Sequence, residues 1–222
     1  MKKFIQPILF FLAPLLTILI VELPIRLSVI EVVNWWLEKP HYILVTYLLI
    51  FLVQSLFLAL INNIYLTIII NQIIFGVFAV ANYYKMLFLN DPILPWDLVF
   101  VKQIFDLLPN LKGLVPVNLI LFTVVVILLV SAVVIKYTKV NVLSIRRRVL
   151  AFFFSFGMLI IIASYPTNFF NNVMEELELS NVTWDNKVSL NNNGFVLNFV
   201  SKINEMSIPT PENYSKQEVS RI

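Results

Sequence analysis

The 222-residue sequence has no cysteine and only one histidine, His41, and these two scarcities exclude several kinds of chemistry. Without thiols the chain can build neither a disulfide framework nor a thiolate metal site. A single imidazole rules out sites with several histidine ligands and argues against a serine–histidine–aspartate triad. The four glycines are scattered, so no glycine-rich phosphate loop is present. We therefore assign no catalytic residue and no metal ligand.

Charge is scarce as well: 13% of the residues are charged and 59% are hydrophobic, with a mean hydropathy of +0.87. A soluble domain carries about 25% charged residues. The net charge of +3 is small. The one dense basic cluster, within Lys136–Arg148, lies between two apolar segments, so nothing supports nucleic-acid binding. The composition predicts an integral membrane protein.

Apolar segments along the chain predict five membrane-spanning helices. Phe4–Val21 has 18 uncharged residues, just enough to cross a bilayer. A cleaved signal peptide is the alternative for it, but the segment is long for one and no small-x-small site follows. Pro40–Tyr84 lacks charged residues altogether and is too long for one helix, so we expect a turn at Asn62-Asn63. The expected spans are 4–21, 42–61, 64–84, 114–135 and 149–165.

The distribution of basic residues predicts the orientation. With five spans, one side of the membrane carries Lys2, Lys3 and the five basic residues of 136–148. By the positive-inside rule that side is cytoplasmic. The N-terminus is then cytoplasmic and the C-terminus extracellular. We predict an all-α integral membrane protein of the plasma membrane, with a transmembrane domain over 1–165 and a mostly helical extracellular linker over 166–222.

The first external segment, Glu22–Pro40, mixes polar and apolar residues and predicts a short amphipathic surface helix. Glu22 and Arg26 are spaced i,i+4 and can pair at the end of the first span. Trp35 and Trp36 are typical of the interfacial belt of membrane proteins. Within the third span, Asn71 and Gln72 are expected to form interhelical hydrogen bonds.

The segment Ala81–Leu98, reading ANYYKMLFLNDPILPWDL, is expected to form a structured loop at the membrane surface. Two carboxylates and two prolines would be costly within a bilayer core. Asp97 is a candidate N-cap or first-turn acid of a short helix that ends before Pro109. This helix either lies in the interface plane or packs on the bundle. Four residues of this segment are candidates for contact with a lipid headgroup: Lys85, Asp91, Trp96 and Asp97. The alternative is a structural role, in which Asp97 caps a helix and Asp91 forms an Asp-Pro turn.

The tail, Thr167–Ile222, is acidic on balance and rich in asparagine. Val173–Leu179 predicts a short helix, Asn193-Gly194 a turn, and the apolar run from Phe195 to Ile203 a short amphipathic helix lying back on the membrane. Ser215 and Glu218 form a capping box at the start of a further helix. Because the sequence stops one turn later, we expect it to be cut short.

Several signatures occur in order along the chain. They are Glu22-Leu23 with Arg26 and Ser28, Asn82-Tyr83-Tyr84-Lys85, Asp91-Pro92-Ile93-Leu94-Pro95-Trp96-Asp97-Leu98, Asn193-Gly194-Phe195 and Pro211-Glu212-Asn213-Tyr214-Ser215. Together they resemble the N-terminal membrane part of the lipoteichoic acid synthase family, phosphoglycerol transferases of the alkaline phosphatase and sulfatase superfamily. Asn213 stands where the family usually has glycine, a mild departure because both residues tolerate a left-handed backbone.

The resemblance implies a large extracellular catalytic domain after this linker. In the family, that domain carries a threonine nucleophile and a divalent metal, usually manganese, and moves glycerol phosphate from phosphatidylglycerol onto a glycolipid-anchored polymer. None of those positions exists in this sequence, so manganese is expected only in the missing domain.

The interpretation is a membrane-anchoring and positioning domain of such a transferase, in a bacterial plasma membrane. The candidate residues for lipid-headgroup contact or domain docking are Lys85, Asp91, Trp96, Asp97 and Arg26. The bilayer is the expected partner; phosphatidylglycerol or a glycolipid is possible, and self-association stays open. The alternatives are a stand-alone lipid-binding or regulatory membrane protein and an inactive truncated remnant.

Overall fold

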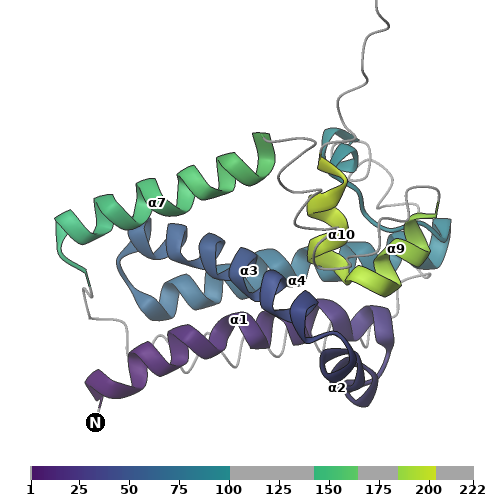
Figure 1. The fold of residues 1–222 in the computed structure, drawn as a ribbon, viewed down its shortest axis with the longest axis horizontal. Helices are drawn as coiled ribbons and strands as arrows, with labels where there is room; N and C mark the ends of the chain where they lie inside the picture. Colours follow the sequence, from purple (N-terminus) through teal and green to yellow (C-terminus); the bar gives the residue numbers. More distant parts are fainter. Residues whose placement is uncertain (1, 101–142, 165–184, 204–222) are drawn as a thin grey trace, which may run out of the picture.

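The computed structural model describes residues 2–100, 143–164 and 185–203, and every regular element in these ranges is helical (Figure 1). The elements are α1 (Lys2–Arg26), α2 (Val29–Glu38), α3 (Pro40–Ile61), α4 (Ile64–Leu89), the short 3-10 helix η1 (Pro95–Phe100), α7 (Ile145–Ser164), α9 (Asn186–Asn193) and α10 (Phe195–Ser201). The all-helical class is confirmed for this part of the chain.

Three of the described helices are long and apolar enough to cross a membrane: Gln6–Arg26 of α1, all of α3 and all of α4. They coincide with the first three predicted spans, although α1 and α4 each run about one turn further than expected. The expected loop over Ala81–Leu98 is therefore wrong in its first half, which is helical up to Leu89. α7 coincides with the predicted span 149–165, with three arginines in its first turn. The predicted span 114–135 and the elements expected at 173–179 and 215–218 lie outside the described residues, so the five-span topology stays a prediction.

The four long helices run along the long axis of the molecule, and the short helices gather at one end (Figure 1). α1 packs mainly against α4, while α3 packs against both α4 and α7. We call the end that carries α2, α9 and α10 the tail end. The opposite end, with the α3–α4 turn and the start of α7, is the arginine end.

Pro14 explains one of the hydrogen bonds between α1 and α3. Pro14 has no N–H, so the carbonyl of Phe10 one turn earlier loses its helical donor. Gln54 Nε2 on α3 donates to this carbonyl at 2.7 Å, and the Tyr47 hydroxyl donates to the adjacent Phe11 carbonyl at 2.9 Å. In a bilayer core such carbonyls have no water to bond, so partners from a neighbouring helix are the means of satisfying them.

Polar side chains also join α1 to α4. Thr17 accepts hydrogen bonds from Asn71 Nδ2 at 3.2 Å and Gln72 Nε2 at 2.9 Å, and Gln72 Nε2 also reaches the Ala13 carbonyl at 3.2 Å. These contacts confirm the interhelical role predicted for Asn71 and Gln72.

The arginine end confirms the turn predicted at Asn62-Asn63. Asn62 ends α3 in a left-handed conformation, with φ 56°, and Asn63 caps the start of α4. Arg148 of α7 donates to the carbonyls of Ala59 (2.9 Å) and Leu60 (2.8 Å), two of the last carbonyls of α3. A cation is favourable there because the helix dipole places negative partial charge at that terminus. Arg146 and Arg147 are exposed.

The amphipathic helix predicted between the first two spans is present as α2. One face, Val32 and Trp35, is buried, and Ser28 caps its start. The rest of the helix is divided between an apolar exposed face (Val29, Ile30, Val33, Leu37) and a polar exposed face (Glu31, Asn34, Glu38). The expectation that Trp35 lies in a lipid-facing belt is wrong: only 4% of this residue is exposed, because the tail packs over it.

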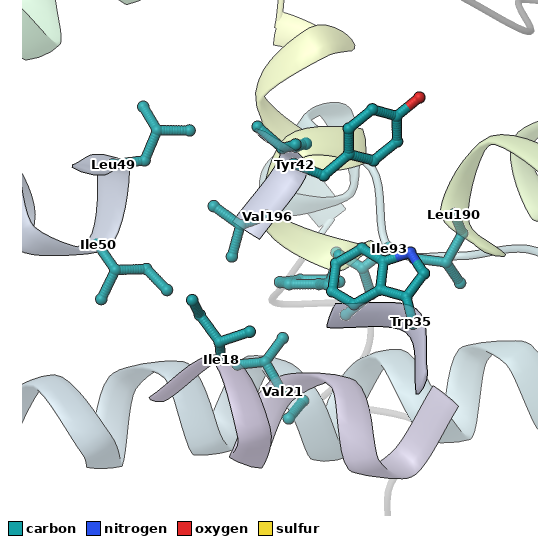
Figure 2. Close-up of a cluster of buried hydrophobic side chains, with 12 residues drawn as sticks. Ile18, Val21, Trp35, Tyr42, Leu49, Ile50, Ile93, Leu190 and Val196 are labelled. Atoms are coloured by element: carbon teal, nitrogen blue, oxygen red, sulfur yellow. The ribbon is translucent and has the colours of Figure 1, made fainter. Parts of the chain in front are cut away.

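The hydrophobic core continues from the bundle into the tail helices. Figure 2 shows Ile18 and Val21 of α1 near Trp35 of α2, with side chains of α9 and α10 completing the cluster. Leu190, Phe195, Val196 and Leu197 are all buried in it. The turn predicted at Asn193-Gly194 and the helix predicted after it are confirmed. The expectation that this helix lies on the membrane with its apolar face is wrong, because Phe195, Val196 and Leu197 are buried against the bundle.

Candidate functional site

Lys85, Asp91 and Asp97 meet at the tail end and form what we call the loop clamp. Lys85 Nζ donates to Asp91 Oδ2 at 2.9 Å, to Asp97 Oδ2 at 2.7 Å and to the Pro92 carbonyl at 2.8 Å. An ammonium group has three hydrogens to donate, so these contacts use its full capacity. The clamp ties the last turns of α4 to the loop that follows.

Local backbone chemistry positions the clamp. Asn90 ends α4 in a left-handed conformation, with φ 53°, which turns the chain toward Asp91. Asn82 Oδ1 accepts the Ile93 N–H at 2.9 Å, and Asp97 Oδ2 accepts the Leu94 N–H at 2.7 Å. Asp97 lies in the first turn of η1, which begins at Pro95, so it is a first-turn acid and not the N-cap.

A second cluster, the tail dock, consists of Glu22, Arg26, Trp35 and Lys39. Arg26 pairs with Glu22 at 3.3 Å, as the i,i+4 spacing predicted, and its guanidinium lies 4.1 Å from the centre of the Trp35 ring. Arg26 Nη2 donates to the Asn191 carbonyl at 3.0 Å. Trp35 Nε1 and Lys39 Nζ donate to the Asn192 carbonyl at 3.2 and 3.3 Å. Three donors thus hold two successive carbonyls at the end of α9.

Burial affects the electrostatics of the dock. Desolvation lowers the pKa of Lys39, and the nearby positive charge of Arg26 lowers this pKa further, while Glu38 opposes both effects. The first of these effects follows from the partial burial of Lys39, since a less hydrated position disfavours the charged ammonium.

The turn between the tail helices fits the dock closely. Glu22 Oε1 accepts the Phe195 N–H at 2.8 Å, and Glu22 is 1% exposed. Gly194 has φ 77°, and a Cβ placed on it would lie 2.6 Å from Glu22 Oε1 and 2.8 Å from Trp35. Only glycine therefore suits this position, both for its backbone conformation and for the space available.

α9 connects the loop clamp with the tail dock. This helix was not predicted from the sequence. Asp185 caps its start by accepting the Lys187 and Val188 N–H groups. Asn186 Nδ2 then donates to Asp91 Oδ1 at 3.0 Å, and Lys187 Nζ donates to Asn90 Oδ1 at 2.7 Å. The capping aspartate is the only sequence signal for the helix, since NKVSLNNN has no helical apolar pattern.

The structure brings three of the five candidate residues together, Lys85, Asp91 and Asp97. Arg26 belongs to the tail dock, and Trp96 is half-buried at the start of η1. In the described residues these candidates bond chiefly to other parts of the chain, and no three His, Cys, Asp or Glu side chains there could hold a metal. Lipid-headgroup contact by any of them stays a prediction.

Comparison with known proteins gives one distant relative. The chain is 24% identical over 143 residues to a protein of Rhizobium meliloti (strain 1021) described as a cyclic beta-1,2-glucan modification protein. The match covers 62% of this chain and 22% of the relative, so the chain spans about a fifth of that protein's length. No family model matches the chain. No solved structure matches it.

Proposed function

We propose that this chain is the membrane-anchoring and positioning part of an enzyme that modifies a glycan at the membrane surface. More specifically, we propose a phosphoglycerol transferase like those of the lipoteichoic acid synthase family, with its catalytic domain following the tail. The observation that carries the proposal is the fixed attachment of α9 and α10 to the tail end, through the loop clamp and the tail dock.

Positioning is a physical task that such an arrangement can perform. The apolar helices set the depth of the protein in the bilayer, and the docked tail helices fix where the following chain begins. An external active site would then stand at a constant height above lipid headgroups, which lowers the entropic cost of meeting a lipid-linked substrate. The clamp contributes by holding the α4–η1 loop beside α9.

The distant relative supports the coarse part of the proposal. That relative is described as a cyclic beta-1,2-glucan modification protein, so its described role concerns a glycan. The transferred group in our proposal, glycerol phosphate, comes from the motif resemblance. The bundle also leaves a large apolar surface on its long helices, which fits association with a lipid bilayer.

The test uses the complete product of the gene that encodes this chain, purified and reconstituted in vesicles with phosphatidylglycerol labelled in its headgroup glycerol. We expect transfer of labelled glycerol phosphate to an added glycolipid or glucan acceptor, with diacylglycerol as the second product. Transfer of a different group, or a gene that ends at the Ile222 codon and yields no transfer, would contradict the proposal. The latter result would favour a stand-alone lipid-binding protein or a remnant.

A further inference from the structure

An apolar groove opens between α3, α4, α7 and α10 in the described part of the chain. Its volume is about 330 Å³. The groove is lined by Leu49 and Val53 of α3, Phe75 and Phe78 of α4, Leu159 and Ile162 of α7, and Phe195, Val196, Phe199, Val200 and Ile203 of the tail. Every lining side chain is a hydrocarbon, although the residues come from four separate segments.

The tail closes one end of the groove. Phe199 of α10 packs edge-on against Phe78 of α4, with ring centroids 6.0 Å apart, and Phe195 lies 6.3 Å from the same ring. Beyond this aromatic cap, Phe75, Leu159 and Val53 are half-buried, as expected for walls that face an open space. The opening therefore lies among the middle turns of the long apolar helices and is closed toward the tail end.

We propose that this groove binds one acyl chain of a bilayer glycerophospholipid. Water is a poor occupant because it needs two to four polar partners, and the lining offers none. The walls belong to helices that fit a bilayer, and the apolar material surrounding such helices is the acyl chains of the lipids. An acyl chain also gains dispersion contacts with the walls that an empty space would forfeit.

Size favours a single chain over a further helix as the occupant. A helix about 10 Å across and about 33 Å long, such as the predicted span 114–135 would form, fills on the order of 2,500 Å³. A whole helix of that size does not enter a groove of about 330 Å³ whose end is closed by α10, and it would only lie across the opening. Because its walls carry no polar group, the binding depends on the hydrocarbon chain and not on the headgroup.

The experiment is photolabelling in vesicles that contain phosphatidylcholine with a diazirine in its acyl chain. After irradiation, labelled peptides are quantified by mass spectrometry, and the exposed outer face of α7 around Phe153 and Phe154 is the internal reference. We expect label on the groove residues Phe78 and Phe199 at a level comparable with this reference. A second arm uses phosphatidylglycerol with the same diazirine in its acyl chain, and it should label the groove equally. Labelling of the groove by only one of the two lipids would overturn the proposal.

Two pairs of variants sharpen the test. Leu159→Trp fills the groove from α7, whereas Leu150→Trp places the same side chain on the opposite, exposed face of that helix. Val53→Phe fills the groove from α3, and Val77→Phe is its exposed counterpart on α4. We expect several-fold less groove label in either filling variant and no change in either exposed variant.

Two further results would overturn the proposal. Groove peptides without label, beside a labelled outer face, would mean that a protein segment such as residues 114–135 covers the groove. An equal loss of label in filling and exposed variants would mean that the label reports general contact with lipid. The proposal does not depend on the proposed enzymatic function, because a failed transfer assay leaves the labelling result unaffected.

Discussion

The backbone N–H of Phe195 donates to the Glu22 carboxylate at 2.8 Å, across 173 residues of sequence. This contact joins the tail to the end of the first membrane-capable helix. Glu22 is almost fully buried and also faces Arg26, so one carboxylate holds both the tail turn and the guanidinium that bonds to α9. Glu22 therefore takes part in two of the contacts that attach the tail, in addition to the bonds made by Trp35, Lys39 and Asp91.

Replacing Glu22 separates its two roles. Glu22→Gln keeps an oxygen for the Phe195 N–H but loses the charge opposite Arg26, whereas Glu22→Ala removes both. Since a hydrogen bond to a charged group contributes about 1.5–3 kcal/mol, we expect Ala to lower the free energy of unfolding by at least about 2 kcal/mol, and Gln by less. Unfolding of the purified protein in mixed micelles measures both values; equal losses would contradict the role of the Phe195 contact.

Two glycines provide a matched pair of substitutions. Gly194→Ala introduces a Cβ too close to Glu22 and Trp35, and a backbone at φ 77° and ψ 169° alone costs a residue other than glycine about 1–3 kcal/mol. Gly157 lies in the middle of α7 with no atom within 4 Å of an added Cβ, so Gly157→Ala should stabilise the helix by about 0.5–1 kcal/mol. Thermal unfolding in detergent should show a lower Tm for the first variant and an unchanged or higher Tm for the second.

A result in which Gly194→Ala is as stable as the wild type would contradict the close fit of the turn. Release of the tail can be measured separately as faster protease cleavage within 185–203. The Gly157→Ala protein is the reference for that rate, since its substitution lies away from the tail.

Pro14 and Gln54 form a pair suited to a double-mutant cycle. Gln54→Leu leaves the Phe10 carbonyl without its donor, which should cost about 1–3 kcal/mol. Pro14→Ala restores a backbone N–H that can bond to the same carbonyl. We therefore expect Gln54→Leu to cost clearly less in the Pro14→Ala background than in the wild type. Additive losses would show that Gln54 does not serve the carbonyl that Pro14 exposes.

The exposed faces of α2 predict how this helix meets a membrane. Leu37 and Glu38 are adjacent and both exposed, but Leu37 belongs to the apolar face and Glu38 to the polar face. Spin labels on Leu37→Cys and Glu38→Cys should differ, with Leu37 more accessible to oxygen and Glu38 more accessible to a water-soluble nickel complex, if α2 lies in the interface. Equal accessibility at both positions would place α2 away from the bilayer surface.

The sequence predicted the features that depend on local chemistry. The absence of charge over Pro40–Tyr84 required two helices, and Asn62-Asn63 was the natural place for the turn because asparagine tolerates a left-handed backbone. The Glu22–Arg26 pair followed from helical spacing, and the bonds of Asn71 and Gln72 followed from their position within an apolar helix.

The features that depend on distant contacts could not be predicted in the same way. α9 is stabilised by its cap and by docking onto Asp91, Asn90 and the tail dock, which no local pattern reveals. Tryptophan is a residue type typical of membrane interfaces, yet Trp35 is buried because residues more than 150 positions later pack over it. Asn193-Gly194 indicated a turn, but the reason that glycine is needed is the approach of Glu22 and Trp35.

The positive-inside rule predicts that the tail helices stand on the outer face of the membrane while the arginine end faces the cytoplasm. The chain has no cysteine, so single cysteines can be introduced without background. Val188→Cys places an exposed thiol on α9, and Ser144→Cys places one at the start of α7. On intact cells, a membrane-impermeant maleimide should label Val188→Cys at once and Ser144→Cys only after permeabilisation; the reverse pattern would contradict the account.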